Sequence, residues 1–148
     1  MQKYISITLV AALFAFASGC SDDALKTYPV TGTVTYKGEP LVGATVGFAP
    51  KTAGQGDGGF ARTDSKGGYK LQTTQGRVDA GTTPGEYYVT ISKVEMTGTG
   101  KYVVDSTGER REEERPVSVI PEKYSSAEGE LTATVEKKNN VFNFDLTD

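Results

Sequence analysis

The stretch Tyr28 to Leu71, YPVTGTVTYKGEPLVGATVGFAPKTAGQGDGGFARTDSKGGYKL, decides the fold, because short alternating runs in it are separated by glycine and proline. Val30, Val34 and Tyr36 fall on one side of an extended chain, and threonines fall on the other. A period of two is typical of a half-buried β-strand. Residues 37–40, KGEP, then predict a turn, since glycine tolerates a positive φ and proline cannot donate to a strand ladder.

The next alternating run predicts a second strand. Its apolar residues occupy every other position, with small or polar residues between them. We expect these apolar side chains on the buried face of a sheet. They are Val42, Ala44, Val46 and Phe48.

The sequence Asp64 to Gly68, DSKGG, predicts a tight turn. Its aspartate can accept hydrogen bonds from amides ahead of it, and its glycines supply positive φ. The turn joins residues 60–63 to residues 69–73. We expect a β-hairpin here, with Tyr69 and Leu71 pointing inward.

The end of the chain repeats this arrangement. Residues 131–135 and 142–146 alternate on either side of the turn sequence 138–140, KNN, and asparagine tolerates the positive φ of a two-residue type I′ turn. We expect a closing hairpin whose arms both contribute to the core. The apolar residues concerned are Leu131, Ala133, Val135, Phe142, Phe144 and Leu146.

The order of these motifs resembles the carboxypeptidase regulatory-like domain. The run GTVTYKGEPLVGATVGF, followed after a glycine-rich loop by ARTDSKGGYKL, has that family's G-x-V spacing, PLxGAxV run and TDxxGxY turn. The likeness covers about residues 30–92. It implies an all-β fold, an antiparallel, transthyretin-like and immunoglobulin-like Greek-key β-sandwich of about seven strands. It also implies a non-catalytic accessory or contact module.

Composition agrees with one all-β domain and excludes most familiar active sites. The 148 residues include 18 glycines, no tryptophan, no histidine and one cysteine. Without histidine, the chain lacks the commonest general base and zinc ligand and any Ser-His or Cys-His pair. We therefore expect no enzyme, no catalytic residue, no metal and no cofactor. The net charge of −3, with no basic stripe, excludes nucleic acid as an expected partner.

The first 27 residues have the pattern of a lipoprotein leader and tether. Tyr4 to Phe16 is apolar but too short to span the ~30 Å of a bilayer core, as in a signal peptide. Residues 17–20, ASGC, resemble the bacterial lipobox, with cleavage between Gly19 and Cys20 and lipidation of Cys20. We expect a signal peptide over 1–19, a lipidated tether over 20–27 and the sandwich over 28–148. An ordinary signal peptide that ends near a cysteine is the alternative.

Lipidation would attach the protein to a membrane. Two or three acyl chains, palmitate among them, hold a protein far more firmly than one. We therefore expect a bacterial cell-envelope protein, lipid-anchored, on the periplasmic side or at the outer membrane or cell surface. Ser21 after the cysteine resembles outer-membrane lipoproteins.

Residues 97–124 depart from the family pattern and form a charged insertion. Residues 101–104 and 117–120 predict the arms of a β-ribbon whose tip is 107–115, TGERREEER, a block with no apolar residue. The alternative is a solvated insertion without fixed structure. The residues that we expect at a partner contact are Tyr88, Tyr102, Arg110 and Arg111.

These observations favour a non-enzymatic, lipid-anchored envelope protein that acts as a structural or protein-interaction module. Its partner would be an unidentified envelope protein or glycan. Recognition of a glycan or peptide through loop tips and exposed tyrosines is the first alternative. A carboxylate-based hydrolase is the last, because the acidic run 112–114 lies in an expected loop and not on the rigid walls of a cleft.

Overall fold

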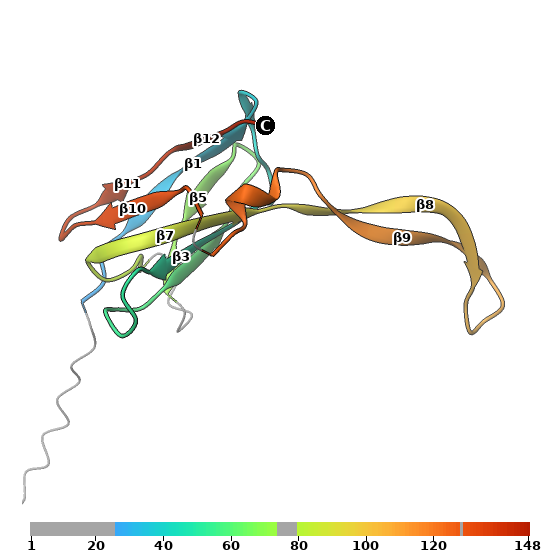
Figure 1. Cartoon of the computed structure of the whole chain (residues 1–148), viewed down its shortest axis with the longest axis horizontal. Helices are drawn as coiled ribbons and strands as arrows, with labels where there is room; N and C mark the ends of the chain where they lie inside the picture. The colour runs from blue at the N-terminus through green and yellow to red at the C-terminus, as the bar shows by residue number, and fades with distance from the viewer. Residues whose placement is uncertain (1–25, 74–79, 128) are drawn as a thin grey trace, which may run out of the picture.

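The structure, a computed structural model, describes residues 26–73, 80–127 and 129–148. Two five-stranded sheets form a β-sandwich, hereafter the body, and a two-stranded ribbon projects from one end of it (Figure 1). The described part contains no α-helix, only the single-turn 3₁₀ helix η1 (Glu122–Tyr124). The expected all-β sandwich is confirmed.

The two sheets differ in how their strands are connected. The first is centred on β1 and consists of β1 (Val30–Tyr36), β2 (Glu39–Pro40), β5 (Gly68–Lys70), β11 (Asn140–Val141) and β12 (Phe144–Leu146). The second has the order β10-β7-β3-β4-β6, with β3 (Thr45–Pro50), β4 (Gly59–Arg62), β6 (Gln72–Thr73), β7 (Gly85–Ser92) and β10 (Thr132–Val135). The ribbon consists of β8 (Val94–Val104) and β9 (Arg110–Ser118).

The hydrophobic core lies between the two sheets. Alternate residues of β1, β3 and β7 point into it, as their period of two predicts, and burial of this apolar surface is the main force that holds the layers together. The larger core residues are Val30, Val34, Val46, Phe48, Tyr69, Leu71, Tyr87, Val89, Ile91 and Leu146.

The first turn is confirmed, but the inward position of Val42 is wrong. Lys37 and Gly38 both have positive φ, 53° and 82°, and they join β1 to β2 in a two-residue hairpin. Leu41 is buried, whereas Val42 is 44% exposed. The alternation breaks because Gly43, with a φ of 70°, ends the extended backbone just before β3 begins.

The hairpin expected around the DSKGG turn is confirmed only in part. The turn itself forms, because Asp64 Oδ1 accepts hydrogen bonds from the amides of Lys66 and Gly68 at 2.8 and 2.9 Å. The strands next to the turn separate, since β4 pairs with β3 and β5 pairs with β1 in the other sheet. Further from the turn, β6 returns to β4 and pairs with it antiparallel, with Phe60 opposite Gln72. The buried Thr63 stays bonded to Ala44 while Gly68 pairs with Thr33. Tyr69 and Leu71 point inward as expected.

The expected closing hairpin is wrong, because its two arms pair in different sheets. β10 pairs antiparallel with β7, whereas β11 and β12 pair parallel with β1, so the chain changes sheets between them. The buried Asn140 fixes this reversal, since its side-chain amide donates to the carbonyls of Glu136 and Lys138 and accepts from the Glu136 amide. Ala133, Val135 and Leu146 are buried as expected, but Leu131, Phe142 and Phe144 are only partly buried.

Candidate functional site

The ribbon is the most exposed ordered element of the described chain. Apart from Thr99, every residue of β8 and β9 is exposed, and none belongs to the core. β8 begins at Val94, earlier than the expected arm at 101–104, and β9 occupies 110–118 in place of the expected arm at 117–120. The block 107–115, expected as the tip, is therefore mostly strand. It pairs with β8 in a register that places Val103 opposite Arg111.

The actual tip is a turn organised by one aspartate. Asp105 Oδ1 accepts hydrogen bonds from the amides of Thr107 and Glu109 at 2.9 and 3.1 Å, and Arg111 Nε lies 2.9 Å from Asp105 Oδ2. The hydrogen bonds from Thr107, followed by the one from Glu109, hold the pKa of Asp105 below its ordinary value. Gly108 supplies the positive φ, 84°, that the turn requires.

The base of the ribbon is fixed to the body on both strands. β8 continues from β7, and the Val119 amide donates to the Lys93 carbonyl at 2.9 Å. Beyond β9, Ile120 and Tyr124 are buried in the core. The ribbon therefore extends from an anchored base, although none of its own residues belongs to the core.

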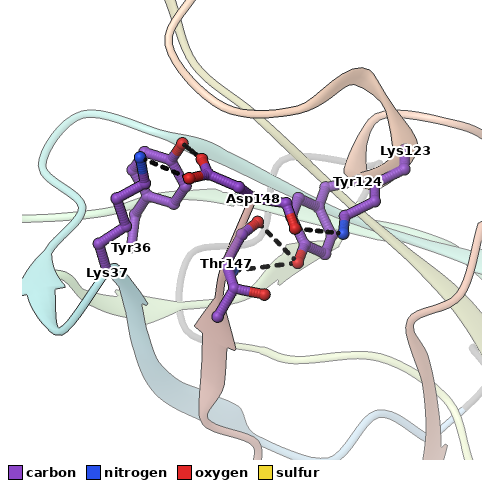
Figure 2. A network of polar contacts seen from close by, with 6 residues as sticks. All are labelled: Tyr36, Lys37, Lys123, Tyr124, Thr147 and Asp148. Carbon is purple, nitrogen blue, oxygen red and sulfur yellow. Dashed lines mark hydrogen bonds and ion pairs between the residues drawn. The ribbon is translucent and has the colours of Figure 1, made fainter.

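A polar network secures the segment that follows the ribbon (Figure 2). The Tyr124 hydroxyl donates to the Thr147 carbonyl and accepts from the Thr147 amide, both at 3.1 Å. Asp148 accepts from the Tyr36 hydroxyl at 2.7 Å and lies 2.8 Å from Lys37 Nζ. The hydrogen bonds from Lys37 and then Tyr36 lower the pKa of the Asp148 carboxyl. η1 and β12 are thereby held together next to the ribbon base.

One face of the ribbon carries a row of apolar side chains. Residues of the two strands that lie directly opposite share a face, so the register places the even-numbered residues of β8 and β9 together. Tyr102 is 60% and Val104 66% exposed, and Val94 and Met96 are similarly open. Exposed apolar side chains gathered on one face of an element mark interaction surfaces. We call this row, Val94, Met96, Tyr102 and Val104, the apolar row.

The structure brings together only two of the four expected contact residues. The Arg110 guanidinium lies 5.1 Å from the centre of the Tyr102 ring, on the face of the apolar row. Arg111 lies on the opposite face, where it pairs with Asp105. Tyr88 is in the body, half-buried in β7, with Lys51 Nζ 5.5 Å from its ring centre.

Sequence reasoning missed the apolar row. Its signal was the recurrence of apolar residues at the even positions 94, 96, 102 and 104. The intervening residues 97–101, TGTGK, hid it because they have the composition of a loop, and the register does shift there between Gly98 and Tyr102.

Hollows lie at two places on the described surface of the body. One of about 500 Å³ lies beside Tyr28, and its other lining residues are Lys26, Gly54, Gln55, Gly56, Thr83, Pro84 and Lys137. The other, about 600 Å³, lies at the DSKGG turn and includes Arg62, Asp64 and Tyr69. Within residues 26–73, 80–127 and 129–148, no three His, Cys, Asp or Glu residues gather as metal ligands would.

The expected anchor lies outside the residues described. This applies to Gly19 and Cys20 and to the tether up to residue 25. Over the part of the chain that is described, no helix is long and apolar enough to cross a membrane.

Comparisons with known proteins give no family for this chain. No family model and no curated protein matches it. Among solved structures it is similar to a 9R-lipoxygenase from Cyanothece PCC8801, with a TM-score of 0.41 and 19% identity over 97% of this chain and 18% of that one. It is also similar to a chlorocatechol 1,2-dioxygenase from Pseudomonas putida, with a TM-score of 0.37 and 17% identity over 87% of this chain and 62% of that one. The chain spans less than two thirds of either protein, and similarities this low carry no information on its activity.

Proposed function

We propose that this chain is a non-enzymatic, lipid-anchored protein of the bacterial cell envelope that acts as a protein-interaction module, with the ribbon as its contact element. The observation that carries the proposal is the exposure of the apolar row on an element that adds nothing to the core. Exposing such side chains opposes solubility, so they are expected to be covered by a partner.

The anchoring part of the proposal rests on the sequence ASGC at residues 17–20. The body begins at Tyr28, whose amide donates to the Thr82 carbonyl at 2.8 Å, so residues 20–27 are left to serve as the tether. The resemblance to carboxypeptidase regulatory-like domains supports the accessory role. Mass spectrometry of the protein purified from membranes should find an acylated Cys20, and an unmodified thiol would contradict the anchor.

Removal of the ribbon tests the contact element. Lys93 and Val119 are directly hydrogen-bonded, the geometry that flanks a two-residue hairpin turn, so Asn-Gly can replace residues 94–118 without displacing the body. We expect the ribbonless protein to melt at the same temperature as the wild type, because no core residue is removed. In cells, crosslinking followed by mass spectrometry should show that the wild-type contacts are lost.

A matched control separates loss of the ribbon from loss of exposed apolar surface in general. Val42, Phe60 and Val141 are exposed apolar residues of the body, and their change to threonine should preserve the crosslinks. Threonine at the four positions of the apolar row should reduce them. A ribbonless protein with all wild-type crosslinks would overturn the proposal.

The hollow beside Tyr28 favours a second function, binding of a glycan or peptide. An aromatic ring, the ammonium of Lys26 5.5 Å from its centre, and a threonine hydroxyl offer stacking and hydrogen bonds. Saturable retention on a polysaccharide column, abolished by Tyr28→Ala, would support it. The hydrolase has less support, since Glu113 and Glu114 are exposed on opposite faces of the ribbon.

A further inference from the structure

β9 has a free edge along its whole length. Its one strand partner in the described part of the chain is β8. Two hydrogen bonds show which residues bond across the ribbon. The Val119 amide donates to the Lys93 carbonyl, and the Asp105 amide donates to the Glu109 carbonyl. The odd-numbered residues are therefore the ones that bond across the ribbon. The even-numbered residues of β9 therefore direct their backbone groups outward, as a template for another strand.

The charges along this edge are self-complementary in one antiparallel register. Residues 109–115 read ERREEER. When two copies run antiparallel with Glu112 opposite Glu112, the pairs are Glu109 with Arg115, Arg110 with Glu114, and Arg111 with Glu113. Each occurs twice, so all the pairs but the central one join opposite charges.

Other registers that keep the same faces together are less favourable. Sliding the strands by two residues so that Arg111 opposes Arg111 also places Glu109 opposite Glu113. Sliding them the other way places Arg111 opposite Arg115 and Glu112 opposite Glu114. Like charges directly opposite in a sheet are destabilising, and opposite charges contribute ~0.2 to 1 kcal/mol a pair. One register is therefore selected.

We propose that the β9 edges of two copies of this chain pair antiparallel about Glu112 and form a four-stranded sheet. This deepens the proposed function, on which it rests, by naming a second copy as a partner of the ribbon. In this register the outward backbone groups of Glu112 face their own counterparts, and those of Arg110 face those of Glu114.

Two features of the ribbon agree with this pairing. Arg110, Glu114 and Arg115 are exposed and make no ion pair within the residues that the structure describes, so they are available to the second copy. Pro116 has an outward-facing nitrogen without a hydrogen, so it ends the pairing on both sides. The pairing is thus confined to a short segment and does not extend into an open array.

A charge exchange tests the proposal in the full-length chain. One variant carries Arg110→Glu and Arg111→Glu, the other Glu113→Arg and Glu114→Arg. Two differently tagged copies are co-expressed, and their co-purification is measured. Each variant should co-purify with itself about tenfold less than the wild type does, because its attractive pairs become repulsive. The two variants together should recover wild-type co-purification, since every exchanged pair is again opposite in charge.

A cysteine at residue 112, which lies opposite itself in the proposed pairing, tests the pairing independently. Glu112→Cys should form a disulfide between peptides of two copies, identified by mass spectrometry, whereas the control Thr97→Cys on β8 should not. Failure of the mixed variants to recover co-purification, or equal disulfide yields at both positions, would overturn the pairing. If the wild type and the charge variants all crosslink to a different envelope protein, the interaction role stands without self-pairing. If the ribbonless protein also keeps those crosslinks, the interaction role itself fails.

Discussion

The turn sequence Asp-Ser-x-Gly occurs twice, once in the body at Asp64 and once at the ribbon tip at Asp105. In both turns the carboxylate accepts hydrogen bonds from the amides two and four residues ahead, and the glycine has a positive φ, 73° at Gly67 and 84° at Gly108. Hydrogen bonds lower the pKa of both aspartates: at Asp64 those from the amides of Lys66 and Gly68, and at Asp105 the one from the Thr107 hydroxyl followed by those from the amides. The local chemistry of the two turns is the same.

The strands on either side of the two turns behave differently. At Asp105 they pair with each other and make the ribbon, whereas at Asp64 they part into opposite sheets. The difference is burial, because Thr63 and Tyr69 lie in the interior and the neighbours of the Asp105 turn are open to solvent. The turn sequence sets the reversal of the chain, and the core decides where the strands go.

The largest contrast between body and ribbon should appear in a pair of truncations. Leu71, next to the Asp64 turn, is 0% exposed, and Val103, next to the Asp105 turn, is 48% exposed. Leu71→Ala should destabilise the protein by ~2 to 5 kcal/mol, whereas Val103→Ala should change stability by less than ~0.5 kcal/mol. Urea unfolding measures both, and comparable losses would contradict the separation of ribbon and core.

A smaller contrast is expected from two tyrosine hydroxyls. The Tyr87 hydroxyl is buried and donates to the Thr83 carbonyl at 2.7 Å, next to the hydroxyls of Thr82 and Thr83. Tyr87→Phe leaves those groups without this partner and should cost ~1 to 3 kcal/mol. Tyr102→Phe on the ribbon is the control, and its unfolding midpoint should equal that of the wild type.

The two turn aspartates give a smaller effect still. Asp64→Ala should lower the melting temperature of the body by less than Tyr87→Phe does, because the turn is exposed but joins the two sheets. Asp105→Ala should leave the melting temperature unchanged and speed amide hydrogen exchange at Thr107 and Glu109. Equal melting shifts would show that the ribbon tip is coupled to the core.

The smallest effect concerns the pH dependence of stability. Lys37 and then Tyr36 lower the pKa of Asp148 below 3.8, so the ionised carboxyl stabilises the fold above that value and the contribution is lost as the pH falls through the folded pKa. Asp148→Asn should therefore flatten the acid limb of the stability curve below about pH 4.

The sequence predicted the elements of the body better than their partners. Period two placed β1 and β3 because each has one buried face, and glycine with aspartate placed the turns. Which strands pair is set by contacts over long separations, and two turn sequences that look like hairpins instead carry the chain between sheets. No feature of the sequence near β12 indicates that this strand pairs parallel with β1.

The sequence predicted a two-stranded ribbon but not the length of its strands. Residues 110–115 of its second strand, RREEER, have charges on both faces and therefore no apolar period, so the sequence predicts a tip there and not a strand. Tyr102 and Arg110 were each chosen as contact residues, and the register now places them together. The self-complementary order of the charges was present in the sequence, but it has no meaning until the strand and its free edge are known.

The parallel contact between the first strand and the last has a consequence for how the molecule is made. The Thr35 hydroxyl donates to the Asp145 carboxylate, 110 residues further along the chain. A nascent chain emerges from its first residues onward, so the first sheet cannot be completed until residues 144–146 have been synthesised. Closing so long a loop is slow. The first sheet would therefore stay incomplete while the segments between β1 and β12 are made.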